Sequence, residues 1–446
     1  MNRNEWDVLV IGGGTAGLLA GISAARNGAS TLIIEASGFL GGNAAFGMTY
    51  GGFYDIKGCQ VVRGLPQEFV ERAIKIGSGL GYINIDSDDT WISGLISVDP
   101  ETVKYLAIEM IREAKCDVWL RSSLIDPIIE NKVIEGARVL TKQGIMDVYS
   151  KCIIDATGDG DFAARAGCRF EQGGEDDQQL ISTMFRISNV DIDVLENYMN
   201  EVVNVDGKDA WKIGTAPLRA SFEYWLPWKF DESRNEMPHL FGVYHHGNPG
   251  DIVINAVGVN ADALNIENIS WAEMELRKRS TELFWYLRDN VSGFEKSFLS
   301  QVYPLGVRES RRIIGDYTIT LEDITSGREY KDVIAMGAYP PDLHSSYGHV
   351  HINREENLAY QIPYRATLPA GIDGVIVAGR CISATFKAQS GLRGIGPSMS
   401  VGQAVGLAAA LAAKRGIDPR AISIEELQSE LLAQGVYLGE KFVSGE

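Results

Sequence analysis

A glycine-rich turn near the start of the chain constrains the fold most strongly. Residues 7–35 read as an apolar strand, three consecutive glycines, a helix of small residues and a second apolar strand ending in Glu35. The glycines follow the G-x-G-x-x-G spacing at Gly12, Gly14 and Gly17. The first glycine of this pattern makes a tight turn, the second lets a pyrophosphate approach the backbone, and the third lets helix and strand pack closely. The pattern predicts a βαβ unit that binds a dinucleotide at its helix N-terminus, with Glu35 on the ribose hydroxyls.

Two later regions favour FAD over NAD as the dinucleotide. Residues 41–43 follow Glu35 after a short loop and extend the surface that can contact phosphate groups. Much later, residues 371–380 read as a turn, an apolar strand and a Gly-Arg pair, and a helix of small side chains begins near residue 397. The N-terminus of such a helix, aimed at a flavin ring, would stabilise negative charge on the reduced pyrimidine edge.

With four further blocks, these segments resemble the FAD-dependent oxidoreductases of the glutathione-reductase-like superfamily. A more distant similarity is to the fumarate reductase and succinate dehydrogenase flavoproteins. The four blocks are Ile154–Asp161, Gly306–Arg312, Ile362–Arg365 and Gly379–Thr385. They follow a consistent order along nearly the whole chain, so the resemblance implies the fold and an FAD cofactor. It leaves the substrate open, because that family is chemically diverse.

The motif and the resemblance together give a set of expected FAD contacts. These residues are Gly12, Gly14, Thr15, Ala16, Gly17, Glu35, Gly41, Gly42, Asn43, Ala156, Thr157, Gly158, Asp159, Gly379, Arg380, Ser398 and Met399. We expect the FAD to be non-covalent, because no histidine-containing attachment motif follows Gly42; Phe46 and Tyr50 stand in that loop instead.

A second glycine pattern at residues 158–163 matches G-x-G-x-x-A and could mark a nicotinamide site. Asp159 and Asp161 would place negative charge against a pyrophosphate, and no second strand ending in an acid follows at the required spacing. In the resembled family, this segment returns the chain to the FAD. We therefore expect no built-in NAD(P)H domain.

The length of 446 residues suggests two domains. The expected fold class is α/β, with a Rossmann-like FAD-binding domain carrying a β-meander and a mixed α+β substrate domain. Residues 1–170 and 356–446 are assigned to the FAD-binding domain. Residues 171–355 are assigned to the substrate domain, which has an alternating strand at 252–259 and a long amphipathic helix at 270–290.

Local signals between residues 65 and 155 predict further elements. A helix is expected over 65–76, and a second begins after the capping Asp99, with Pro100 at its first position, and ends near residue 114. Short strands near 117–121, 124–130, 133–140 and 145–155 form a parallel strand and a β-meander.

Charge and cysteine content narrow the classes of partner. Forty-one basic and 59 acidic residues give a net charge of −18, which repels nucleic acid and anionic lipid. The cysteines have neither C-x-x-C nor metal-ligand spacing, which predicts reduced, mainly structural thiols. They are Cys59, Cys116, Cys152, Cys168 and Cys381.

The apolar stretch from Val8 to Ala25 has the look of a signal peptide but contains the glycine motif and lacks a basic leading segment. We expect a cytoplasmic protein without a membrane-spanning segment. Its partners would be a small-molecule substrate and an electron acceptor that the sequence does not identify, and a homo-oligomer is compatible with it.

Four residues are the candidates for substrate chemistry: Arg308, His344, Tyr364 and Arg365. Arg308 lies in a block where related flavoproteins bring the substrate domain over the ring, and its planar fork suits a carboxylate or hydroxyl groups. The alternative is a structural ion pair with Glu309 or Asp316. Tyr364 and Arg365 precede the strand that returns to FAD and are expected close to the ring.

His344, His349 and His351 stand close together in the sequence. Their alternating spacing would suit a metal, but the stretch has no matching cysteine and looks like a loop, so we expect no metal site. His344 belongs to an Asp-x-His pattern like that of the family and is the candidate acid–base group. The alternative is a surface loop of solvated histidines. The segment from Trp225 to Trp228 has a superficial similarity to the tryptophan motif of flavin halogenases, but its residues stand in a different order. We therefore expect these tryptophans to belong to an aromatic cluster that lines a core or a pocket.

These features predict an FAD-dependent oxidoreductase that transfers a hydride between a small polar organic substrate and flavin N5, as a dehydrogenase or oxidase. A fumarate-reductase-like reductase of activated C=C bonds is the enzymatic alternative. A flavin-carrying electron-transfer subunit is the alternative from another class. An enclosed polar pocket beside the flavin would favour an enzyme, and a flat apolar surface would favour the subunit.

Overall fold

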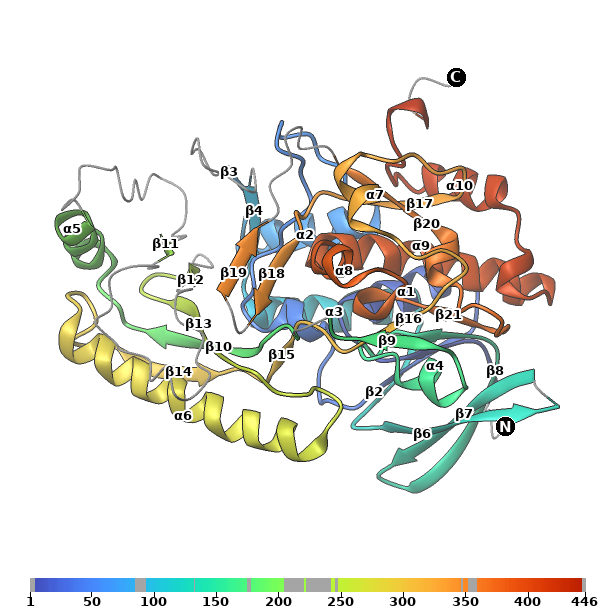
Figure 1. Cartoon of the computed structure of the whole chain (residues 1–446), viewed down its shortest axis with the longest axis horizontal. Helices are drawn as coiled ribbons and strands as arrows, with labels where there is room; N and C mark the ends of the chain where they lie inside the picture. The colour runs from blue at the N-terminus through green and yellow to red at the C-terminus, as the bar shows by residue number, and fades with distance from the viewer. Residues whose placement is uncertain are drawn as a thin grey trace.

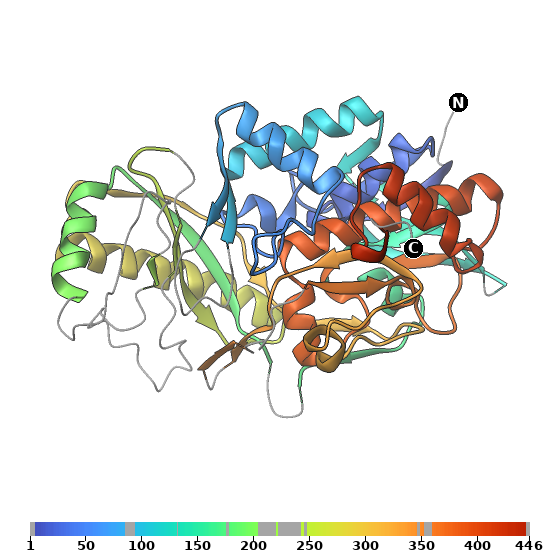
Figure 2. The ribbon, with the colours of Figure 1, turned by 90° about the horizontal axis from the view of Figure 1, so that it is seen from above.

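The fold has two large hydrophobic cores, and each belongs to one structural unit. The structure is a computed structural model, and it describes residues 5–84, 94–131, 133–174, 178–203, 220–221, 242–244, 248–345, 348–351 and 359–442. One core draws its buried residues from both ends of the chain, and the other from residues 181–294. Figures 1 and 2 show the second unit beside the first in both views.

A parallel sheet with an antiparallel extension organises the first core. Among the described strands, the order is β5-β2-β1-β8-β7-β6, with β21 also pairing with β8. Strands β1, β2, β5, β8 and β21 pair in parallel, whereas β6, β7 and β8 form the expected meander. The strands are β1 (Glu5–Ile11), β2 (Thr31–Glu35), β5 (Asp117–Leu120), β6 (Ser123–Glu130), β7 (Val133–Thr141), β8 (Gly144–Asp155) and β21 (Val375–Val377).

Two helices of small residues cover this sheet, α1 (Thr15–Arg26) and α9 (Ile395–Arg415). The backbones of the two helices are in close contact. A Cβ added at Gly402 or Gly406 of α9 would lie only 2.3 Å from a carbonyl oxygen of α1. By length and hydropathy α9 could cross a membrane, whereas no such segment was expected from the sequence. However, 94% of its apolar window is buried inside the fold. We therefore assign α9 as a core helix.

An antiparallel sheet organises the second core. Its described strands follow the order β11-β12-β13-β10-β14, and β15 also pairs with β10. The long helix α6 (Ile266–Asn290) packs along this sheet. It begins at Ile266, after the capping Asn265, four residues before the predicted start. The strands are β10 (Ile181–Ser188), β11 (Ala220–Ser221), β12 (Gly242–Tyr244), β13 (Ile252–Val259), β14 (Phe298–Val302) and β15 (Gly306–Val307).

The chain rejoins the first core earlier than the predicted residue 356. Ile313, Ile319 and Val333 are already buried in that core. Strand β16 (Arg311–Ile313) pairs with β9 (Phe170–Gln172), and β17 (Val333–Gly337) pairs with β20 (Tyr360–Pro363). These pairings join segments that lie far apart in the chain, and local composition does not reveal such pairings.

The remaining elements surround the two sheets. They are α2 (Leu65–Lys75), β3 (Gly79–Asn84), β4 (Gly94–Val98), α3 (Pro100–Ala114), α4 (Asp161–Arg165), α5 (Ile192–Val203), α7 (Leu321–Thr325), β18 (Asp342–Ser345), β19 (Gly348–His351), α8 (Phe386–Leu392) and α10 (Ile424–Ala433), with the short 3-10 helices η1 (Gly42–Ala45) and η5 (Gly379–Cys381).

Candidate active site

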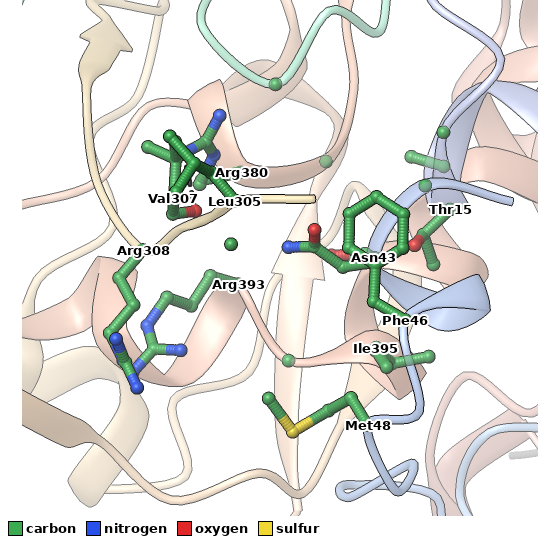
Figure 3. Close-up of a pocket in the computed structure, with 18 of the residues that line it drawn as sticks. Thr15, Asn43, Phe46, Met48, Leu305, Val307, Arg308, Arg380, Arg393 and Ile395 are labelled. Carbon is green, nitrogen blue, oxygen red and sulfur yellow. Dashed lines mark hydrogen bonds between the residues drawn. The ribbon is translucent and has the colours of Figure 1, made fainter. Parts of the chain in front are cut away.

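A cavity of about 330 Å³ lies between the two units. The glycine turn before α1, the loop that follows η1, the turn after β8, η5 and the start of α9 form its wall on the first unit. Strand β10 and residues 304–308 close it from the second unit (Figure 3). The predicted FAD contacts in its wall are Gly14, Thr15, Ala16, Gly42, Asn43, Ala156, Thr157, Gly158, Asp159, Gly379, Arg380 and Ser398.

The glycine turn has space and hydrogen-bond donors for a phosphate group. Gly14 precedes α1 without a side-chain cap, so N–H groups of the first turn are left for another acceptor. A Cβ built on Gly14 would meet only the Cα of Gly42, 4.0 Å away. These features fit a pyrophosphate held at the helix N-terminus.

The remaining predicted cofactor residues lie outside the cavity wall. Gly12 has φ +97° and a Cβ there would lie 2.5 Å from the carbonyl oxygen of Ala156, so the residue serves the turn. At Gly17 the corresponding atom would lie 1.9 Å from the carbonyl oxygen of Gly12, so that residue serves packing. Gly41 accepts a hydrogen bond from the Thr15 hydroxyl at 3.1 Å, and Met399 is buried in the core.

Glu35 ends β2 and braces the glycine turn. Its carboxylate accepts hydrogen bonds from the backbone N–H of Gly13, at 2.7 Å, and of Ser37, at 2.6 Å. A carboxylate has about four acceptor positions, so capacity remains for hydroxyl groups.

The turn after β8 is held from beneath by Asp155. This buried carboxylate accepts hydrogen bonds from the N–H (3.1 Å) and hydroxyl (2.7 Å) of Thr157 and from the N–H of Ala163 (2.8 Å). Burial raises the pKa of Asp155, and these hydrogen bonds oppose that shift. Arg380 then joins the turn to the second unit, donating to Asp159 at 2.7 Å and to the carbonyl of Val307 at 2.6 Å.

Arg308 lines the cavity from the second unit, with only 6% of its surface exposed. Its Nη1 donates to the carbonyl of Leu180 at 2.9 Å and to the hydroxyl of Ser182 at 2.8 Å. The carboxylates considered as its structural partners are engaged elsewhere. Glu309 pairs with Arg312 at 2.5 Å, and Asp316 pairs with Arg420.

Arg393 also lines the cavity, although it was not among the expected site residues. Its Nη2 donates to the backbone carbonyl of Asp342 at 2.7 Å and lies 3.4 Å from the carboxylate of the same residue. The available signal was its place directly before the glycine that opens α9. Phe46, Met48 and Tyr339 also line the cavity, although none of them was among the expected site residues.

His344 is buried, contrary to the alternative of a solvated loop, but does not line the cavity. Its Nε2 lies 3.1 Å from the Asp342 carboxylate, which also accepts a hydrogen bond from the Tyr339 hydroxyl at 2.9 Å. His344 therefore reaches cavity residues through Asp342. His349 lies opposite it on β19, which pairs with β18 as an antiparallel strand, so this stretch is not a loop.

Tyr364 and Arg365 lie away from the cavity, so their expected place beside the ring is corrected. The hydroxyl of Tyr364 is buried against the carbonyl of Pro419, at 3.0 Å. Arg365 points outward and pairs with Asp332 at 2.9 Å. The partners of both side chains, Pro419 and Asp332, lie far away in the sequence, so sequence order alone does not reveal where these side chains point.

Other sequence interpretations have mixed outcomes. All five cysteines are free thiols, and only Cys59 is exposed. Within the described ranges, no group of three or more His, Cys, Asp or Glu residues could hold a metal ion. Trp225 and Trp228 lie outside the described residues.

Comparison with known proteins identifies the family to which the chain belongs. A family model described as FAD dependent oxidoreductase matches residues 7–431. The digeranylgeranylglycerophospholipid reductase of Thermoplasma acidophilum is 30% identical over 209 residues, 42% of this chain and 48% of that protein. The NADH:fumarate oxidoreductase of Klebsiella pneumoniae is 29% identical over 188 residues, 34% of this chain and 20% of that protein.

The chain thus matches about half the length of the first of these relatives. Among solved structures, the flavin-dependent brominase Bmp2 aligns with a TM-score of 0.50 and 13% identity, over 94% of this chain and 81% of that one. That likeness concerns the fold alone. With a family match over most of its length and a glycine turn suited to a pyrophosphate, the chain belongs to the FAD dependent oxidoreductase family, and FAD is its cofactor.

Proposed function

We propose that this enzyme transfers a hydride between a small polar organic substrate and non-covalently bound FAD. One observation carries the proposal: a single cavity is lined both by the predicted FAD-binding turns and by the buried Arg308 of the other unit. When bound, the flavin supplies N5 as hydride acceptor or donor. A partly enclosed cavity of this kind also supports an enzyme over an electron-transfer subunit.

The residues that would hold FAD follow from the cavity wall. The first turn of α1 would bind the pyrophosphate, and Glu35 would accept hydrogen bonds from the ribose hydroxyls. The start of α9, which Gly394 caps without a side chain, would lie toward the flavin and favour negative charge on it.

Arg308 would orient the substrate. Hydrogen bonds to Leu180 and Ser182 fix its guanidinium in the cavity wall, and its fork can donate two parallel hydrogen bonds to one substrate group. Tyr339 lines the cavity, and its hydroxyl donates a hydrogen bond to the buried Asp342 carboxylate behind the wall. His344 would act behind Asp342 as a positioning residue and not on the substrate itself.

The test is anaerobic flavin reduction by a panel of polyols, amines, hydroxy acids and other small polar compounds. We expect one class to bleach the flavin. Arg308→Lys should keep its FAD content and thermal midpoint but reduce flavin about a hundredfold more slowly, because lysine lacks the planar fork. That factor corresponds to about 3 kcal/mol of transition-state stabilisation.

Arg112→Lys is the matched control, because the Arg112 side chain is 76% exposed. It should leave the rate unchanged. A normal rate in Arg308→Lys would remove the role assigned to Arg308, and a panel without any bleaching would count against the dehydrogenase or oxidase direction. Reoxidation of dithionite-reduced enzyme by enoates would instead favour a reductase of activated C=C bonds.

A further inference from the structure

We propose that Arg308 and Arg393 together bind a carboxylate group of the substrate, and that Asp342 positions Arg393. This inference rests on the proposed function and names its substrate class as small organic acids. Both arginines line the same cavity. Figure 3 shows them grouped on one side of it, with Thr15, Asn43 and Phe46 on the other.

A short chain of contacts fixes the two arginines near each other. Arg308 donates to the carbonyl of Leu180, and the N–H of Leu180 donates to the carbonyl of His344 at 2.9 Å. Two residues before His344, Asp342 accepts hydrogen bonds from Arg393. Arg308 is therefore bound to Leu180, Leu180 is bound to β18, and β18 also binds Arg393, so these backbone contacts hold both guanidinium groups in place.

Arg393 retains hydrogen-bonding capacity for a ligand. Its Nε is buried and has no hydrogen-bond partner among the described residues. A buried charged donor without an acceptor costs free energy, so an oxygen atom of a ligand or of water is expected there. The two guanidinium groups carry one more positive charge than the Asp342 carboxylate beside Arg393, and this excess favours an anion over an amine.

The remaining wall restricts the kind of anion. Phe46, Met48, Met184 and Leu305 add apolar side chains to the wall. A small organic acid presents a carboxylate to the arginines and a carbon skeleton to these residues, which inorganic phosphate or a polyol does not. The planar carboxylate also matches the guanidinium fork.

Asp342 is suited to position Arg393 because it is itself fixed from several directions. Its side chain is 5% exposed and contacts Tyr339 and His344, while its N–H donates to the hydroxyl of Ser390 at 3.0 Å. With that support, the Asp342 backbone carbonyl and carboxylate hold one end of the Arg393 guanidinium.

The test measures binding to the FAD-loaded enzyme by calorimetry, so no turnover is required. The probes are lactate, succinate and acrylate, their neutral amides, and inorganic phosphate. We expect the acids to bind more tightly than their amides and than phosphate, with affinity falling as salt is raised. Arg308→Gln and Arg393→Gln should each weaken acid binding roughly ten- to hundredfold. Arg112→Gln, on the surface, should not change it.

Arg393→Lys serves as a second variant if Arg393→Gln folds poorly, and it should also lose affinity, because its ammonium lacks the fork. Asp342→Asn should weaken binding of the acids but not of the amides. Equal losses for acids and amides would show that Asp342 is merely structural. Equal affinity of acids and amides for the unmodified enzyme, tighter binding of phosphate, or unchanged acid binding in both arginine variants would overturn the carboxylate site.

The outcomes separate this inference from the proposed function. Acids that bind through both arginines while no compound exchanges electrons with the flavin would leave the carboxylate site standing and remove the proposed reaction. Flavin bleaching by a neutral alcohol, without acid binding, would do the reverse.

Discussion

At the scale of single residues, Glu35 has two tasks that one substitution can separate. Its carboxylate accepts N–H groups of Gly13 and Ser37, and it is the predicted partner of the ribose. Glu35→Gln keeps the size but loses the charge, and one charge-assisted hydrogen bond contributes about 1.5–3 kcal/mol. We expect FAD affinity to fall about tenfold or more, measured by titrating the apoprotein with FAD. If Glu35→Gln left the dissociation constant of FAD unchanged but lowered the melting temperature of the apoprotein, Glu35 would stabilise the turn without binding the ribose.

At the scale of elements, the contact of α1 with α9 sets the shape of the FAD-binding unit. A Cβ at Gly406 would lie 2.3 Å from the carbonyl oxygen of Ala20, so the two backbones would have to separate. Gly406→Ala should lower the free energy of unfolding by about 1–3 kcal/mol through overpacking, although alanine favours helix by about 1 kcal/mol. Lys414→Ala, at the exposed end of α9, is the control and should change stability little. Denaturant unfolding checks both; a stabilised Gly406→Ala would contradict the close contact.

At the scale of the whole molecule, Arg186 joins the two units beside the cavity. Lying on β10, it pairs with Asp251 and with Asp99, the residue that caps α3 in the other unit. Arg186→Met would leave two largely buried carboxylates facing each other, a loss of about 3 kcal/mol for a buried pair. Arg138→Met breaks an exposed pair with Asp147 and should cost under about 1 kcal/mol. The thermal midpoint should therefore fall several degrees further in Arg186→Met; equal midpoints would show that this junction adds nothing.

Local signals predicted much of the first unit. The strand–turn–helix–strand at residues 5–35 and the helix after Asp99 form as expected, the latter as Pro100–Ala114. Such elements depend on neighbouring residues: the positive φ of Gly12, the capping carboxylate of Asp99 and the run of apolar strand residues. A dinucleotide site could be predicted because a phosphate-binding turn is itself a local structure, and the choice of FAD came from residues 41–43, residues 371–380 and the helix near residue 397.

The sequence by itself determined the glycine turn, the cofactor and the family, whereas only the tertiary structure decided which polar side chains reach the cavity. Arg308 and Arg393 line it, but Arg365 turns outward to Asp332, and His344 stops behind Asp342. Arg308 and Arg365 both belong to blocks that carry the family resemblance, yet only Arg308 reaches the cavity. Their directions depend on pairings between strands and helices far apart in the chain, and such long-range contacts leave no periodic or spaced pattern around the residues they orient.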